Sequence, residues 1–240
     1  MGHEFELPQE AIVEATPEEV WAAITTGPGI DSWFMGRTDV SGGAVRTAFG
    51  GIDMGTTTVT AAEEPSRFAH TGDTAPDGRF VAYEFLIEGR DHGSTLVRMV
   101  TSGFLPGDDW ADEYEAMTGG LALFFATLVE YLTHFPGRHA TPVTEFGPPV
   151  TDWPRAWEIL YAELGASSPG EKVRLDVDGL PPIEGVVYHR GDQTLGVRTP
   201  DALYRFMQGF GGPLIASHHV FGDTEGQGPA WRAWLERLYS

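Results

Sequence analysis

An amphipathic stretch at residues 109–135, DWADEYEAMTGGLALFFATLVEYLTHF, constrains the fold of this chain most. Apolar side chains recur there in steps of three and four, which places them on one stripe of a helix ~40 Å long. A stripe this wide and aromatic suits a curved sheet better than a single partner helix. Gly119 and Gly120 interrupt it, either to admit a neighbouring backbone or to bend the helix and widen a cavity. The stripe comprises Trp110, Tyr114, Met117, Leu121, Phe124, Phe125, Leu128, Leu132 and Phe135.

The composition restricts the classes of partner and of chemistry. A formal net charge of −20 makes nucleic acid and anionic membranes poor partners, because both repel an acidic surface. The absence of cysteine excludes disulfides, thiol nucleophiles and thiolate metal sites. No apolar run reaches the ~20 residues that a bilayer span needs, and the N-terminus lacks the regions of a signal peptide. We therefore expect a cytoplasmic protein.

The segments before the long helix alternate as strand, helices and further strands. Thr16-Pro17-Glu18-Glu19 forms a capping box that opens a helix, with proline at its first position. The last two strands form a hairpin, since apolar residues alternate along both and turn residues separate them. This order predicts an α+β fold in which an antiparallel meander wraps around the long helix. The expected strands are 3–15, 37–49, 52–62, 66–71, 79–88 and 95–104.

Three motifs resemble a known superfamily. They are ATPEEVW at 15–21, GIDSWF at 29–34 and TSGF at 101–104. Together they are similar to the START-like (SRPBCC) superfamily, and most of all to the branch named after the activator of the heat-shock protein 90 ATPase. The resemblance covers about residues 3–138. One departure is Thr101, where many relatives have the histidine of a His-Ser-Gly-Phe motif.

The resemblance implies a helix-grip domain over residues 1–138, in which the sheet and the long helix enclose an apolar cavity. Polar side chains in the strands would then orient a ligand, and His70 and Arg98 are the candidates if they point inward. Aromatic and apolar residues would supply the walls. The candidate ligand-binding residues are Trp33, Phe34, His70, Tyr83, Phe85, Arg98, Met99, Trp110, Met117 and Phe124.

Motifs for catalysis, metals and cofactors are missing from the sequence. It contains no nucleophile elbow, no phosphate-binding loop and no His-Glu-x-x-His helix. Successive strand residues point to opposite faces, so His218 and His219 are not arranged to chelate one ion. The acidic cluster of Asp108, Asp109, Asp112 and Glu113 is explained by the positive end of the helix dipole. We therefore predict no catalytic residues, no metal and no cofactor.

The second half of the chain is a separate prediction. Residues 136–151 are rich in proline and glycine and indicate a linker. A helix capped by Thr151 or Asp152 follows, then strands at 172–178, 183–190, 193–199 and 213–220, and a helix that begins at Pro229. Residues 151–240 thus repeat the first half's order without its first strand. Two interpretations stay open, a degenerate second helix-grip copy and an unrelated α+β extension.

Three functions are consistent with these features. The first is binding of a small apolar or aromatic molecule in the cavity, without turnover and driven by burial of apolar area. The second is a cyclase, dehydratase or hydrolase that uses the same cavity, since such chemistry needs only one or two acid–base groups in a shaped site. The third is a protein-interaction module that modulates a chaperone, for which an exposed apolar patch and a filled core are expected.

Overall fold

The computed structural model describes residues 2–108, 110–209 and 212–240. The chain divides into two compact units, which we call unit 1 (Met1–His139) and unit 2 (Ala140–Ser240). Each unit consists of one antiparallel sheet with helices, so the predicted α+β class is confirmed.

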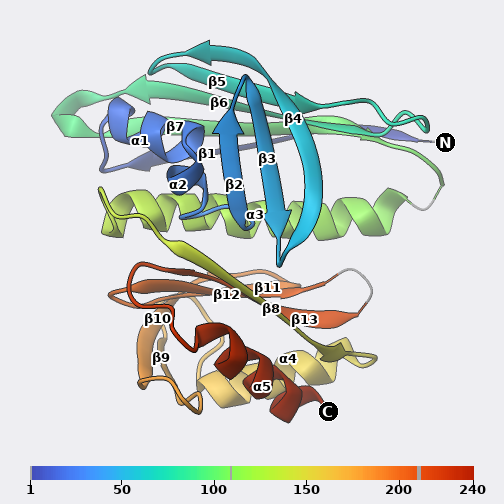
Figure 1. The fold of residues 1–240 in the computed structure, drawn as a ribbon, viewed down its shortest axis with the longest axis vertical. Helices are drawn as coiled ribbons and strands as arrows, with labels where there is room; N and C mark the ends of the chain where they lie inside the picture. The colour runs from blue at the N-terminus through green and yellow to red at the C-terminus, as the bar shows by residue number, and fades with distance from the viewer. Residues whose placement is uncertain (1, 109, 210–211) are drawn as a thin grey trace. The chain divides into compact units, whose positions relative to one another are not determined.

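Unit 1 is built on a seven-stranded sheet (Figure 1). Its strand order is β1-β7-β6-β5-β4-β3-β2, so neighbours in sequence pair from β2 to β7, and β1 joins β7 at the far edge. Every pair is antiparallel, which confirms the predicted meander. The strands are β1 (His3–Val13), β2 (Arg37–Ser41), β3 (Ala44–Phe49), β4 (Ile52–Glu63), β5 (Arg67–Gly72), β6 (Phe80–Gly89) and β7 (Thr95–Leu105).

The predicted strand 37–49 is wrong, because the structure has two strands there, joined by a two-residue turn. Gly42 and Gly43 have φ angles of 60° and 76°, and a type I′ turn requires positive φ at both of its central residues. Ser41 pairs with Ala44 across this turn. Glycine adopts positive φ at little cost, so the two glycines reverse the chain inside a stretch that looks continuous in sequence.

The helices of unit 1 are α1 (Pro17–Thr25), α2 (Gly27–Ile30) and α3 (Trp110–His134), and a single 3₁₀ turn, η1 (Asp91–Gly93), joins β6 to β7. The predicted capping box is confirmed: the Thr16 hydroxyl accepts from the Glu19 backbone, and the Glu19 carboxylate accepts from the Thr16 backbone. Figure 1 shows α1 and α2 on the same side of the sheet as α3. The short helices therefore form a second layer over one end of the sheet.

The long helix α3 is buried along only part of its predicted stripe. All its buried residues lie between Leu121 and Leu132, whereas Trp110, Tyr114 and Met117 are half-buried. The difference follows from the second layer, since Phe34 packs on Phe124 with ring centroids 5.2 Å apart. By length and composition α3 could cross a membrane, yet this buried stretch makes it the core helix of unit 1. Asp109, the predicted first residue of the helix, lies outside the described residues.

The two glycines of α3 do not admit a neighbouring backbone. A Cβ atom built on Gly119 or Gly120 meets no atom within 4 Å other than those of the helix itself. The close-approach explanation of these glycines is therefore wrong, and the helix surface is open where they lie.

Unit 2 has a six-stranded antiparallel sheet in the order β8-β13-β12-β11-β10-β9. Its first strand pairs with its last, and the remaining strands follow in descending order, which is the topology of unit 1 with one strand fewer. Its elements are β8 (Thr141–Pro149), α4 (Trp153–Leu164), β9 (Lys172–Leu175), β10 (Ile183–Arg190), β11 (Thr194–Arg198), β12 (Ala202–Gln208), β13 (Pro213–Val220) and α5 (Gln227–Tyr239). This shared topology favours the interpretation of unit 2 as a second helix-grip copy.

Two strands of unit 2 were not predicted. Residues 136–151 contain β8 instead of a linker, so the expectation that the second half lacks a first strand is wrong. Pro142 and Pro149 fit there because β8 is an edge strand, in which half of the backbone N–H groups need no partner in the sheet. Strand β12 escaped prediction because its residues from Ala202 to Met207 are all buried, so apolar and polar residues do not alternate.

The core of unit 2 packs the tryptophan side chains of both helices against the sheet. Trp157 of α4 and Trp231 and Trp234 of α5 belong to one buried cluster, with Phe206 of β12 at its centre. The N-cap of α4 is Asp152, one of the two predicted caps, and its carboxylate accepts from the Arg155 backbone.

Candidate functional site

A cavity of about 80 Å³ lies in unit 1 between the sheet and the segment that carries α1 and α2. Strands β3, β4, β5 and β6 supply one wall, and α1, α2 and the turn after α2 supply the other. Its lining is mostly apolar and comprises Ile24, Ile30, Trp33, Phe34, Met35, Val45, Thr47, Met54, Gly55, Thr57, His70, Tyr83 and Phe85. The short helices, rather than α3, therefore form its roof.

Five of the ten candidate residues line this cavity, namely Trp33, Phe34, His70, Tyr83 and Phe85. Trp33 and Phe34 follow α2, and contacts with the surrounding core fix their side chains. The Trp33 indole nitrogen donates to the Ala23 carbonyl of α1 at 3.0 Å, and its ring meets Phe85 edge-on. An aromatic wall is thus held by a hydrogen bond and by ring contacts before any ligand arrives.

The other five candidates do not line this cavity. Arg98 lies on the opposite face of β7 from Met99, because the buried residues of this strand alternate with half-buried ones. Met99 and Phe124 are buried core residues behind the lining. Trp110 stacks on His3 of β1 at 3.8 Å, and Met117 is half-buried in the first half of α3. None of the five contributes to the cavity surface.

The polar groups of the cavity come from neighbouring strands at one level of the sheet. Tyr83 of β6 pairs with His70 of β5, and their rings stack with centroids 5.0 Å apart. Thr57 of β4 reaches His70 diagonally, with its Oγ1 atom 2.7 Å from the imidazole Nδ1. Directly paired residues share a face of the sheet, so the register gathers these side chains. Sequence analysis missed Thr57 because the pairing of the consecutive strands β4 and β5 shifts register at a bulge between Val59 and Ala61.

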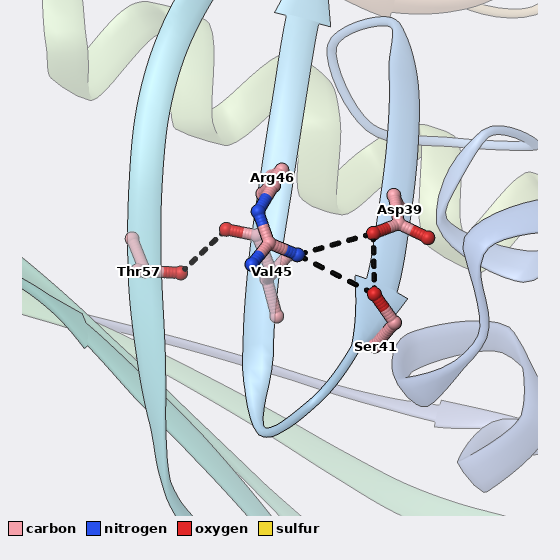
Figure 2. A network of polar contacts seen from close by, with 5 residues as sticks. All are labelled: Asp39, Ser41, Val45, Arg46 and Thr57. Atoms are coloured by element: carbon pink, nitrogen blue, oxygen red, sulfur yellow. Dashed lines mark hydrogen bonds and ion pairs between the residues drawn. The ribbon is translucent and has the colours of Figure 1, made fainter.

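The hydrogen bonds of Thr57 favour one tautomer of His70. Figure 2 shows the Thr57 hydroxyl donating to the Val45 carbonyl of β3, at 3.4 Å. A hydroxyl has a single hydrogen, so Thr57 can also contact Nδ1 only by accepting from it. We assign the Nδ1–H tautomer because it satisfies both contacts. The Nε2 atom then carries a lone pair, and it has no hydrogen-bond partner among the residues described.

The same strand β3 shows why only one face of this corner is apolar. Arg46, next to Val45, donates to the Asp39 carboxylate and to the Ser41 hydroxyl, at 3.2 and 3.4 Å (Figure 2). These side chains are exposed and lie on the other face of the sheet. The ion pair therefore stays in solvent, and Val45 is free to line the cavity.

Burial keeps both polar groups of the cavity uncharged at neutral pH. Loss of solvation lowers the pKa of His70 to about 4, because the imidazolium form is disfavoured away from water. The same effect raises the pKa of the Tyr83 hydroxyl to about 12. Within the described parts of the chain this hydroxyl has no hydrogen-bond partner either. The cavity thus offers an acceptor, His70 Nε2, and a donor, the Tyr83 hydroxyl.

A further polar group lies one strand beyond Tyr83. Thr101 of β7 pairs with Tyr83, and its buried hydroxyl has no hydrogen-bond partner in the described structure. An unsatisfied buried hydroxyl costs about 1–3 kcal/mol. Thr101 opens the TSGF motif of residues 101–104, so this motif leaves a polar group without a partner in the core of unit 1.

The size of the cavity limits its occupant. A volume of about 80 Å³ holds several waters, and it is smaller than the ~150 Å³ that accommodates benzene in an engineered apolar cavity. Met54 is 51% exposed, and a methionine side chain changes rotamer easily. Movement of Met54 would open the space for one ring.

Among the described residues, no group of three histidine or acidic side chains could hold a metal ion.

An antiparallel sheet closed against a long C-terminal helix, with an apolar cavity under two short helices, defines a helix-grip protein of the START-like class. Residues 14–133 match the family model of the activator of Hsp90 ATPase homolog 1-like protein, and the chain belongs to this family. The predicted resemblance is therefore confirmed. No curated protein matches the sequence.

Solved structures similar to this chain differ in how much of it they cover. The Aha1 dimer from Colwellia psychrerythraea is 19% identical, covers 53% of this chain and 96% of its own, and has a TM-score of 0.43. DynU16, from the dynemicin biosynthetic locus, is 19% identical, covers 97% of this chain and 96% of its own, and has a TM-score of 0.44. The di-domain ARO/CYC BexL from the BE-7585A biosynthetic pathway is 14% identical, covers 92% of this chain and 86% of its own, and has a TM-score of 0.41. These values support no inference about function.

Proposed function

We propose that unit 1 binds a small apolar or aromatic molecule in the cavity beneath α1 and α2, without turning it over. The observation that carries this proposal is the pair of unpartnered polar groups, His70 Nε2 and the Tyr83 hydroxyl, in an otherwise apolar lining. Ligand sites combine apolar walls with a few placed polar groups in the same way. Burial of apolar ligand area, at about 25 cal/mol per Å², would supply the affinity.

The polar groups also define the ligand that fits best. A neutral imidazole with a free lone pair accepts a hydrogen bond, so the preferred ligand carries a hydroxyl on its ring. A phenol-like compound would donate to His70 Nε2 while its ring contacts Trp33 and Phe34. A charged ligand is disfavoured, because no ionised side chain lines the cavity.

The test compares p-cresol with toluene, which differ only in the hydroxyl. Met35 and Met54 line the cavity, so ¹³C-methyl labelling of methionine provides NMR signals at the site, and Met207 in unit 2 serves as an internal reference. We expect p-cresol to shift the signals of Met35 and Met54 and to bind at least fivefold more tightly than toluene. In His70→Asn the preference for p-cresol should disappear, because Asn keeps a donor for Thr57 but has no counterpart of Nε2.

Two results would contradict the proposal. One is that neither compound shifts the two cavity methionines below about 5 mM. The other is that Val45→Phe, which fills the cavity, binds p-cresol as tightly as the wild type. The substitution overpacks the site at a cost of about 1–3 kcal/mol, so circular dichroism at the temperature of the titration must first show that the variant is folded.

A second function, catalysis in the same cavity, is favoured by one specific observation. His70 Nε2 and the Tyr83 hydroxyl present a proton acceptor and a proton donor on neighbouring strands, as acid–base chemistry requires. Mass spectrometry of ligand recovered after prolonged incubation separates the two functions. An unaltered ligand supports binding alone. A product that forms with the wild type, and not with His70→Asn, would make unit 1 an enzyme.

A further inference from the structure

A second and larger cavity, of about 520 Å³, lies in unit 2, where the turns after β9 and β11 meet the start of α5. Its size falls in the range of small-molecule sites, about 300–1,000 Å³. All of its lining residues belong to unit 2, and we call it the acidic pocket. It is lined by Gly179, Leu180, Pro181, Pro182, Ile183, Glu184, Thr199, Pro200, Asp201, Tyr204, Asp223, Glu225 and Gln227.

The charges of the acidic pocket have one sign. Four carboxylates line it, and no arginine or lysine does. Glu184 is paired with Arg174 at 3.1 Å, whereas Asp201, Asp223 and Glu225 form no ion pair with any residue that the structure describes. The Thr199 hydroxyl donates to Asp201 at 2.9 Å and so fixes the direction of that carboxylate. Three uncompensated negative charges therefore border the pocket of a chain that is already strongly acidic.

Two nearly buried polar side chains at the pocket lack partners. Tyr204 is 7% exposed, and its ring packs against Trp231. Its hydroxyl has no hydrogen-bond partner among the residues that the structure describes. Gln227 is 9% exposed, and its Oε1 accepts from the Trp231 indole at 3.1 Å. An indole N–H can only donate, so the amide oxygen must face Trp231. The amide nitrogen is then left unpaired among the described atoms.

The protonation state of Tyr204 follows from its neighbours. Burial, with the nearby Asp201 charge, raises the pKa of its hydroxyl to about 12. The group therefore stays neutral, and it lies close enough to Asp201 to sense its charge. The Tyr204 hydroxyl and the Gln227 amide nitrogen are not fully enclosed by protein, so a water or a ligand in the pocket can reach and satisfy both.

We propose that the acidic pocket binds a small organic cation, an ammonium compound with a compact apolar body and one acceptor oxygen. The ammonium group would pair with Asp201 and with the carboxylates at the rim. The acceptor oxygen would accept hydrogen bonds from the Gln227 amide and from the Tyr204 hydroxyl. Leu180, Pro181 and Ile183 offer apolar contact for the body. A bare metal ion fits less well, since no three acidic side chains of the described residues converge on one point.

The experiment uses the full chain and two probes that differ only in the amino group, 2-amino-1-phenylethanol and 1-phenylethanol. Isothermal titration calorimetry should show the amine binding with a Kd below about 1 mM and at least tenfold more tightly than the alcohol. Added NaCl should weaken binding of the amine, because exposed charges are screened. Asp201→Asn should raise the Kd of the amine at least tenfold, and Tyr204→Phe should raise it at least threefold. Glu236→Gln, which removes an exposed carboxylate outside the pocket, should leave the Kd unchanged.

Several outcomes would overturn the proposal. Equal affinity of the wild type for both probes is one, and it does not depend on whether any variant folds. Wild-type affinity of Asp201→Asn for the amine is another. Displacement of the amine by an equal concentration of CaCl₂ would point to an inorganic cation instead. Loss of amine binding in Val45→Phe would place the amine in the cavity of unit 1, so this variant separates a failure here from a failure of the function proposed for unit 1.

Discussion

Replacement of His70 by asparagine should change how the stability of unit 1 depends on pH. The pKa of His70 falls from its ordinary value of 6.5 to about 4 in the folded chain. The unfolded chain therefore takes up a proton between these values and the folded chain does not. Stability that is fully present above pH 6.5 is lost as the pH falls toward 4. An asparagine does not titrate, so the variant should lack this loss.

The magnitude follows from the two pKa values. One pKa unit corresponds to about 1.4 kcal/mol, and the change from pH 7 to pH 5 covers most of the window between the two values. Integration over that range gives a loss of about 2 kcal/mol for the wild type that His70→Asn does not share. His189, His218 and Asp31 also have shifted pKa values, but they are present in both proteins and cancel in the comparison. The variant's lower absolute stability does not affect this difference.

Urea unfolding at pH 7 and pH 5, followed through the methyl signals of Met35 and Met54, isolates unit 1. The matched control is His92→Asn. This histidine is exposed in the turn between β6 and β7 and has a φ angle of 64°, which asparagine also adopts readily. Between pH 7 and pH 5, the His92→Asn control should lose as much unfolding free energy as the wild type. A pH dependence of His70→Asn within about 0.5 kcal/mol of the wild type would refute the reasoning about His70.

Three further changes have expected outcomes. Phe124→Ala should destabilise unit 1 by about 3–5 kcal/mol in urea unfolding, because it removes a buried ring that packs on Phe34; a loss below about 1 kcal/mol would contradict this packing. Asp31 has a pKa raised to about 6 by burial, so its protonated form stabilises the fold and that contribution is lost as the pH rises through 6. The shift of about 2 pKa units corresponds to about 3 kcal/mol, which solvent screening reduces because Asp31 is only half-buried. Asp31→Asn should therefore gain about 1–2 kcal/mol over the wild type at pH 8 and almost nothing at pH 4 in the same assay. Thr16→Ala should cost about 1 kcal/mol in thermal unfolding through loss of the capping box, and no change would refute that role.

The sequence predicted the features that depend on local periodicity. The stripe of the long helix, the capping box at Thr16 and the hairpin of β6 and β7 are all encoded within one element or one turn. The alternation of strands also shows that Arg98 and Met99, which are consecutive in one strand, cannot both face the cavity, and in the structure neither lines it.

Features that depend on how separate elements pair and pack were not accessible in the same way. The contact of Thr57 with His70 requires the register of β4 against β5, which a bulge near Val59 shifts. Residues 141–149 form a strand because they lie at the edge of a sheet, and no local sequence pattern indicates this position. The half-buried start of α3 depends on where α1 and α2 end, which is set by packing of Phe34 on Phe124.

The pairing of the first strand of each sheet with its last has a consequence for synthesis of the chain. Strand β1 leaves the ribosome first, but its partner β7 follows only after all the other strands of unit 1, since Val13 pairs with Thr95. At about 5–20 residues per second, β1 therefore waits several seconds with its backbone groups unpaired. Strand β8 waits in the same way for β13. Closing such long loops is slow, so the nascent chain passes twice through a period in which an unpaired edge is open to association with other chains.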